Sequence, residues 1–248
     1  MIEVRNLQKS FGANKILDGV SFRIENGESV AIIGRSGGGK SVLLKHLVGL
    51  LQPDSGEVLV DGENIGPLNE RQLLRVRKKF GMVFQGAALF DSMTVAENVG
   101  FAFRNHQHLT AGEIANRVAA ALEMVDLPGT ENRKPAELSG GMRKRVGLAR
   151  AIIYEPQIVL YDEPTTGLDP IVSDIIDKLM IRVRDHLKVT SIVVTHDMRS
   201  ARRVANRVMM LHEKKLYASA APEEFFASPD PVVRQFVDGV ADAKECLF

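Results

Sequence analysis

The sequence predicts an α/β protein whose core is a parallel β-sheet. Segments with strand patterns alternate with segments of helical periodicity, which is typical of an α/β core. Two apolar runs, residues 29–33 and 158–161, are unbroken, as expected of strands buried on both faces of a parallel sheet. From Ala87 to about Glu137 the strand signal is weak and helical patterns prevail. We therefore expect a helical lobe, at about 87–141, inserted into the core.

Composition limits the kind of protein. The chain has 248 residues, 45% of them hydrophobic and 25% charged, which suits a globular domain with a full core and room for two lobes. A net charge of +1 argues against bulk binding to nucleic acid. The single cysteine, Cys246, excludes an intrachain disulfide and favours a reducing compartment. No signal-peptide pattern opens the sequence, and no apolar run reaches the roughly 18 residues of a membrane span, so any membrane role is expected to depend on partners.

The first third of the chain is predicted to contain four strands and two helices, and the first two strands are half-buried. Alternating apolar residues and the turn at 25–28 predict the half-buried strands, and the buried strand leads into glycines. In order, these elements are strands Ile2–Val4, Val20–Ile24 and Ser29–Ile33, helix Val42–Leu51, strand Val58–Asp61 and helix Glu70–Lys79.

Strand patterns return after the helical stretch. Buried strands are expected at Ile158–Tyr161 and Ser191–Thr195, and a hairpin at Val208–Leu211 and Lys215–Ala218. From Pro222 the sequence is helical and interrupted by prolines. We accordingly expect a main domain at 1–220 and a peripheral helical tail at 221–248.

A glycine-rich loop follows the strand at 29–33. Its residues match the pattern G-x-x-x-x-G-K-[ST] of a phosphate-binding P-loop, namely Gly34, Arg35, Ser36, Gly37, Gly38, Gly39, Lys40 and Ser41. Glycines let several main-chain N–H groups converge on phosphate oxygens, and the next helix adds its positive N-terminal end. Lys40 is expected to reach the β- and γ-phosphates, and the Ser41 hydroxyl to bind Mg²⁺. The loop alone leaves kinases, GTPases and motor ATPases open.

The strand at 158–161 ends in two carboxylates, Asp162 and Glu163. An acidic residue at the carboxyl end of a buried strand can hold Mg²⁺, and the next one can orient or deprotonate an attacking water. Solvated acidic residues are also common at such strand ends, so this pair indicates a nucleotide site only together with other motifs.

The segment Leu138-Ser139-Gly140-Gly141-Met142 resembles the LSGGQ signature of ABC ATPases, and it lies 24 residues before Asp162. Four further positions resemble motifs of that family in the same order along the chain. They are an aromatic residue for adenine (Phe11), the Q-loop glutamine 45 residues after Lys40 (Gln85), the D-loop aspartate (Asp169) and the H-loop histidine (His196). The resemblance spans residues 11–196.

This resemblance implies the fold and the chemistry of an ABC-type P-loop NTPase. It implies a RecA-like parallel-sheet core, an N-terminal antiparallel β subdomain and the inserted helical lobe. ATP and Mg²⁺ are the implied cofactors, with Ser41, Gln85 and Asp162 near the metal. Glu163, His196 and Gln85 are the implied catalytic residues, and Phe11 is expected to stack on adenine.

The signature implies a homodimer. Ser139, Gly140 and Gly141 begin a helix expected at Met142–Tyr154, which makes a second anion-binding helix end. In the family, two subunits pair head to tail, and each signature closes on the nucleotide of the other subunit. Met142 stands where glutamine is usual, which alters contacts near the ribose. The run 143–145 is interpreted as a solvated helix face.

Three segments are similar to one subfamily, the Mla-type ATPases of phospholipid transport systems that contain MCE proteins. These segments are Phe84–Val99, the methionine-ending signature and Asp230–Gly239. The similarity implies an MlaE-type integral-membrane permease, a periplasmic MCE partner and a small STAS-domain subunit, with the ATPase at the cytoplasmic face of the inner membrane. Ala87, Leu89 and Phe90 are expected to form an apolar socket for the permease.

Two alternatives remain open from the sequence. Polar amino acid importers share much of the same scaffold. An ABC protein that acts on ribosomes or DNA usually has two ATPase domains or long coiled coils, which are not expected in this chain.

Overall fold

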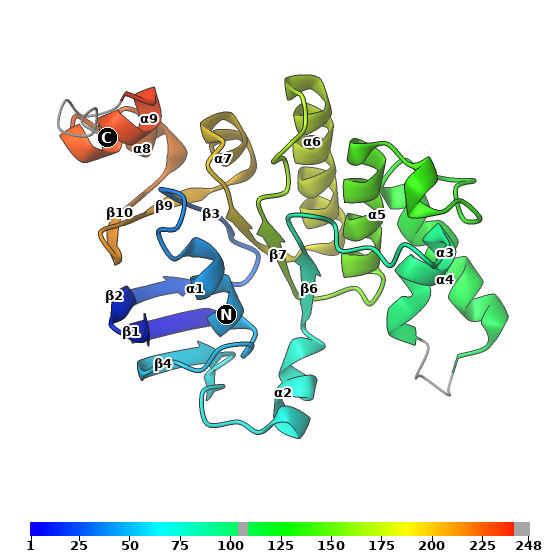
Figure 1. Cartoon of the computed structure of the whole chain (residues 1–248), viewed down its shortest axis with the longest axis horizontal. Coiled ribbons are helices and arrows are strands. Elements are labelled where there is room, and N and C mark those ends of the chain that lie inside the picture. The colour runs from blue at the N-terminus through cyan, green and yellow to red at the C-terminus, as the bar shows by residue number, and fades with distance from the viewer. Residues whose placement is uncertain (104–108, 241–248) are drawn as a thin grey trace. The chain divides into compact units, whose positions relative to one another are not determined.

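The computed structural model describes residues 1–103 and 109–240 of the chain, which divides into two compact units (Figure 1). Unit 1 comprises Met1–Leu68 and the described part of the segment that begins at Val193. Unit 2 is Asn69–Ile192, a wider insertion than the lobe expected at 87–141. Cys246 and the end of the tail expected at 221–248 lie outside the described residues.

Unit 1 begins with an antiparallel sheet of order β2-β1-β4-β5. Its strands are β1 (Ile2–Phe11), β2 (Asn14–Ile24), β4 (Ser55–Val60) and β5 (Glu63–Asn64). Alternate side chains such as Ile2, Val4 and Leu7 are buried, which is the pattern of a sheet with one covered face. The N-terminal antiparallel β subdomain implied by the sequence is thereby confirmed.

The second sheet region of unit 1 contains β10 (Lys215–Ala220), β9 (Arg207–His212) and β3 (Ser29–Gly34) in that order. β3 runs parallel to β9, and every residue of β3 is buried, as its unbroken apolar run predicts. β9 and β10 form the expected hairpin. Helix α1 (Lys40–Leu47) follows β3, and α7 (Met198–Val204) precedes β9.

The C-terminal segment packs on this region of unit 1. Helices α8 (Pro222–Phe226) and α9 (Pro231–Asp238) contribute Phe225 and Val233 to a buried cluster with Ile33 and Met210. The expected peripheral tail therefore has an apolar face against the strand that precedes the glycine loop.

Unit 2 contains parallel strands and most of the helices. β6 (Phe80–Val83) pairs in parallel with β7 (Ile158–Asp162), and β8 (Thr190–Val194) lies beside β7 and ends where the chain passes back to unit 1. The sequence prediction of an α/β fold with a parallel sheet is confirmed. The four-residue strand β6 was not predicted, because so short a segment shows no clear periodicity.

Among the helices of unit 2, α5 (Gly140–Ile152) packs beside α6 (Pro170–Leu187) (Figure 1). The others are α2 (Glu70–Arg77), α3 (Val95–Val99), the 3₁₀ turn η1 (Gly100–Phe103), α4 (Ala111–Met124) and the 3₁₀ turn η2 (Pro135–Glu137). Asn69, Thr94 and Thr110 each cap a helix through a capping box, which sets where α2, α3 and α4 begin. Between residues 87 and 139, the described part of the chain contains no strand.

Gly81 offers a test of how closely α5 packs on β6. A Cβ added at Gly81 would lie 2.3 Å from the main-chain oxygen of Ala151, at the end of α5, whereas one added at Gly112 in α4 would meet nothing within 4 Å. We expect Gly81→Ala to lower the free energy of unfolding by about 3 kcal/mol through overpacking. Gly112→Ala should leave it unchanged or raise it by up to about 1 kcal/mol, because alanine favours helix. Urea unfolding followed by circular dichroism measures both, and equal stabilities would show that β6 and α5 are not packed as described.

Candidate functional site

The glycine-rich loop of unit 1 connects β3 to α1 through backbone that only glycine adopts easily. Gly34, Gly37 and Gly39 have φ values of 152°, 73° and 94°. A Cβ at Gly34 would lie 2.5 Å from the main-chain oxygen of Leu211, and one at Gly39 would lie 3.0 Å from the Leu17 side chain. The N–H of Gly38 donates to the main-chain oxygen of Arg35 at 3.0 Å, which closes the turn. The loop thus has the tight curl expected of a phosphate cradle.

Lys40 and the start of α1 supply the positive character of this loop. Lys40 is buried, and its ammonium donates to the main-chain oxygens of Gly34 at 2.8 Å and Arg35 at 3.0 Å. Gly39 occupies the N-cap of α1, so no side chain caps the first helical turn, and that turn contains no acidic residue. Main-chain donors and a positive helix end are therefore directed to one place, which fits the oxygens of a triphosphate. Ser41, half-buried in the same turn, brings a hydroxyl suited to Mg²⁺.

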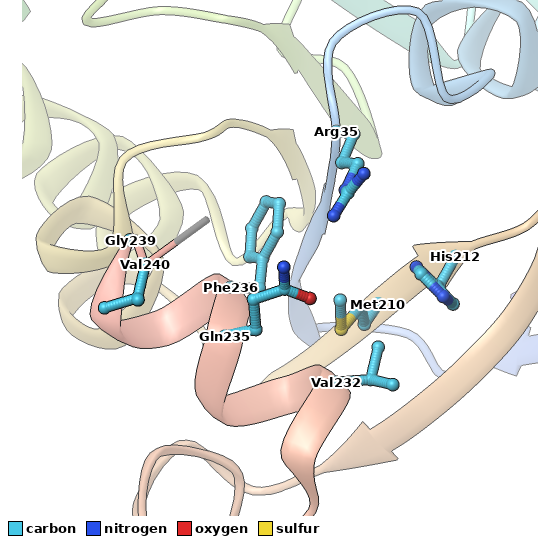
Figure 2. A pocket seen from close by; sticks show the side chains of 8 residues that line it. All are labelled: Arg35, Met210, His212, Val232, Gln235, Phe236, Gly239 and Val240. Atoms are coloured by element: carbon cyan, nitrogen blue, oxygen red, sulfur yellow. The ribbon is translucent and has the colours of Figure 1, made fainter. Parts of the chain in front are cut away.

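The side chain of Arg35 points away from the glycine-rich loop (Figure 2). It lines a pocket of about 270 Å³ with Met210 and His212 of β9 and with Val232 and Phe236 of the tail helix α9 (Figure 2). The sequence motif groups Arg35 with the nucleotide-binding residues. The main-chain oxygen of Arg35 accepts from Gly38 and Lys40 inside the loop, while its side chain lies against α9.

Two more sequence-predicted residues lie in unit 1. Phe11 ends β1 with half of its surface exposed, and the Lys9 ammonium lies 5.6 Å from the ring centroid. An exposed aromatic ring offers a flat apolar face to a base. His196 is exposed two residues after the end of β8, and the next residue, Asp197, caps α7.

In unit 2, the acidic pair stands at the carboxyl end of β7. Asp162 is half-buried, and Glu163 has a left-handed φ of 51°. Such a conformation costs on the order of 1–3 kcal/mol for a residue with a Cβ, and it clusters at functional sites. The Thr166 hydroxyl donates to Oε2 of Glu163 at 2.9 Å, which fixes the direction of the carboxylate. Tyr161, the residue before the pair, is fully buried, and this burial raises the pKa of its hydroxyl.

The signature residues form the N-terminal end of α5, two residues earlier than predicted. Ser139 is the N-cap, and its hydroxyl accepts from the N–H of Met142 at 3.3 Å. Gly140 is exposed. Gly141 lies so close to α6 that a Cβ there would stand 2.6 Å from the Val172 side chain. The predicted D-loop residue Asp169 caps α6 through the N–H groups of Ile171 and Val172.

Lys144 corrects one sequence prediction. The run 143–145 was interpreted as a solvated helix face, and for Lys144 this is wrong, because it is only 8% exposed. Its ammonium donates to the main-chain oxygens of Gln85, just after β6, and of Glu163, at 3.4 Å for the latter. Burial lowers the pKa of this lysine, while the charges of Glu163 and Asp162 act in the opposite direction. Gln85 and Glu163 are thereby brought together through one side chain.

Sequence reasoning missed Lys144 and Thr166 as site residues. The helical period of 3.6 residues places Lys144 on the same face as Gly141 and Leu148, both buried, and this was the available signal. For Thr166 there was none, because its role follows from the turn after Glu163.

Comparisons with known proteins decide the family. A family model described as "ABC transporter" matches residues 17–166. The chain belongs to the ABC transporter family. It is accordingly an ATP-hydrolysing cassette of α/β fold, as the motifs predicted.

Relatives in this family match nearly the whole chain. It is 43% identical to protein TRIGALACTOSYLDIACYLGLYCEROL 3, chloroplastic, of Arabidopsis thaliana, over 98% of this chain and 74% of the relative. It is 40% identical to the intermembrane phospholipid transport system ATP-binding protein MlaF of Escherichia coli, over 98% and 90%. It is 42% identical to the probable ribonucleotide transport ATP-binding protein mkl of Mycobacterium leprae, over 96% and 69%.

Solved structures of other cassettes resemble this ABC protein closely. The dimeric ATP-binding cassette MJ0796 bound to ADP and Pi has a TM-score of 0.82 and 33% identity, over 90% of this chain and 99% of that one. CbiO1 from Clostridium perfringens, part of the complex cbiONQ, has a TM-score of 0.85 and 31% identity, over 94% and 93%.

The hydrogen bond from Thr166 to Glu163 gives a first test of the site. Thr166→Val removes the donor that orients the carboxylate, and we expect kcat for ATP hydrolysis to fall about ten- to a hundredfold, since a hydrogen bond to a charged group contributes roughly 1.5–3 kcal/mol. Thr166→Ser keeps the hydroxyl and should stay near the wild-type rate. Steady-state ATPase kinetics measure both variants. If Thr166→Val matches Thr166→Ser, the contact does not orient Glu163.

Proposed function

We propose that this chain is the ATPase subunit of a transporter that moves phospholipids between the membranes of a bacterial envelope. The cargo is assigned from the similarity to MlaF, which is 40% identical over nearly the full length of both chains and whose name specifies intermembrane phospholipid transport. The second relative named for a lipid, the Arabidopsis protein, supports the same class of cargo. The name of the mycobacterial relative mkl gives ribonucleotide transport as a probable role, which is the competing cargo.

The glycine-rich loop would bind the triphosphate of ATP. Main-chain N–H groups of residues 34–39 and the ammonium of Lys40 would hold the phosphates, and the ring of Phe11 would stack on adenine. Ser41, Asp162 and Gln85 would hold Mg²⁺, since a hydroxyl, a carboxylate and a carboxamide are all oxygen donors. The metal would supply charge neutralisation at the phosphates when bound.

For hydrolysis, Glu163 would act as the general base, and its carboxylate would accept a proton from the attacking water. Its carboxylate is held by Thr166 and its main chain by Lys144, so it is positioned before the reaction begins. His196, exposed after β8, and Gln85, exposed after β6, would orient the water and the γ-phosphate.

Pairing of two copies is supported by exposed apolar surface next to the D-loop. Ile171, in the first turn of α6, is 76% exposed, and Ile175, one turn later, is 38% exposed. Apolar side chains that share a helix face in this way are typical of a contact surface. In the proposed dimer, Ser139, Gly140 and Gly141 close on the nucleotide of the partner, which is the arrangement implied by the motif.

The permease surface expected from the sequence needs one correction. Ala87 was expected to line an apolar socket with Leu89 and Phe90, but it is 1% exposed. Phe90 is 42% exposed, and its ring lies 4.6 Å from that of Phe101, so this part of the surface is retained. Leu89 is half-buried.

A second apolar surface lies between α3 and α4. It is a pocket of about 450 Å³ lined by Ala96, Glu97, Gly100, Ala111, Ile114, Ala115, Val118 and Glu131. We assign it to a short apolar helix of an MlaE-type permease, with the acidic residues facing a basic residue of that helix. No described helix of this chain is long and apolar enough to span a bilayer. From the relationship to MlaF, we assign the chain to the cytoplasmic face of the inner membrane, where it would be held by the permease. STAS-domain and MCE-domain subunits complete the proposed assembly.

The catalytic assignment predicts that Glu163→Gln binds ATP and hydrolyses it at least about a hundredfold more slowly, because the amide cannot accept a proton. Nucleotide affinity, measured by titration calorimetry, should stay within a few-fold of wild type. Turnover close to wild type in the assembled complex would remove Glu163 from the role of general base.

The cargo assignment predicts a barrier defect when the gene is deleted in its host. We expect surface-exposed phospholipid in the outer membrane and higher permeability, both restored by the wild-type gene. Ala115→Glu places a charge in the α3–α4 pocket and should fail to restore them, whereas Ala120→Glu, exposed on α4 but outside the pocket, should succeed. Normal lipid distribution after deletion, with loss of ribonucleotide or amino acid uptake, would transfer the assignment to that cargo.

A further inference from the structure

The main chain that follows Gln85 adopts an unfavourable conformation. Ala87 and Ala88 are consecutive residues with φ values of 60° and 49°. Residues with a Cβ rarely adopt the left-handed region of backbone conformation, and those that do are usually single residues. A loop of this kind persists only where its surroundings hold it.

The signature helix α5 provides the groups that hold it. Arg150 donates to the main-chain oxygens of both alanines, at 2.6 Å each. Lys144, two turns earlier on the helix, donates to the main-chain oxygen of Gln85. Between them, Gly147 leaves room for Ala87, because a Cβ there would lie 3.3 Å from that of Ala87. The loop therefore rests on one face of α5, with a cation on each side of the contact.

The same lysine also reaches the catalytic segment. Its ammonium lies 3.4 Å from the main-chain oxygen of Glu163, itself a left-handed residue. Two strained segments, one on either side of Lys144, are thus held by cations of a single helix. The N-cap of this helix is Ser139 of the signature.

We propose that Lys144 and Arg150 are positioning residues that clamp the loop after Gln85 in its left-handed form, and that this clamp keeps Gln85 and Glu163 in place for hydrolysis. A partner that pulls the loop off α5 would release both segments together. The inference rests on the proposed roles of Gln85 and Glu163 for its kinetic consequence, but the clamp itself is a property of the loop.

The first test removes one cation of the clamp, and then replaces the two left-handed alanines by glycine, which needs no clamp. Arg150→Met should lower kcat for ATP hydrolysis about tenfold, with the KM for ATP within twofold of wild type. Glycine adopts positive φ without support, so adding Ala87→Gly and Ala88→Gly to Arg150→Met should recover at least half of the lost rate. Arg145→Met is the matched control. Arg145 lies on the same helix and donates to the main-chain oxygen of Asp126, away from the loop, so this variant should keep the wild-type rate.

The second test needs no catalysis. Hydrogen exchange in residues 84–90 should accelerate at least tenfold in Arg150→Met and stay unchanged in Arg145→Met. If Arg150→Met does not fold, Arg150→Lys, which retains the charge without the paired donors, takes its place and should show the same changes at smaller size.

The outcomes separate the clamp from the proposed catalytic roles. Unchanged exchange in the loop would overturn the clamp, whatever the ATPase rate. A faster loop with an unchanged rate would overturn the positioning role. Loss of rate without recovery in the glycine variants would show a general structural defect and would also overturn it. Lys144→Met should reproduce the kcat loss, and Lys144→Arg should recover part of it. Turnover by Glu163→Gln, measured alongside, reports on the proposed function alone.

Discussion

Main-chain N–H groups at the starts of two helices are the feature on which the proposed function of this protein depends. Helix α1 in unit 1 and helix α5 in unit 2 both begin in glycine-rich segments, with Gly39 and Ser139 at their N-caps. Neither first turn contains an acidic side chain. A helix start of this kind attracts phosphate without a dedicated charged side chain, and the chain adds Lys40 beside the first of them. The surrounding fold serves to place these ends, since a buried parallel strand precedes α1 and α6 packs closely on Gly141.

Two segments with strained backbone are held by helix α5. Glu163 and the pair Ala87 and Ala88 are left-handed, and each is tied to α5 by a buried or half-buried cation. A lysine exposed on a helix surface keeps its hydration. Lys144 is buried and has lost most of it, which costs free energy. Its desolvation is offset by main-chain oxygens, and the same contacts join the loop after β6 to the end of β7.

Much of the fold could be predicted from the sequence, because buried strands and glycine loops have strong local patterns. The run Ser29–Ile33 lies within β3, and the acidic pair lies at the carboxyl end of β7. The motifs identified the family, since they recur in the order that is typical of it. What could not be predicted depends on tertiary contacts. The burial of Lys144, the direction of the Arg35 side chain and the support of Glu163 by Thr166 all follow from packing between elements distant in sequence or from turn geometry. Ala87 was misplaced for the same reason, because its burial is set by Gly147 on another element.

Titration of ATP and Mg²⁺ into the wild-type chain and into Lys40→Ala by calorimetry tests the central claim most directly. If the phosphates bind at the start of α1, the wild type binds one ATP per chain, and Lys40→Ala, which loses the ammonium beside the loop, binds at least tenfold more weakly while its thermal unfolding is unchanged in the absence of nucleotide. Equal affinities in the two proteins would contradict the account, since the phosphates would then have to be held elsewhere.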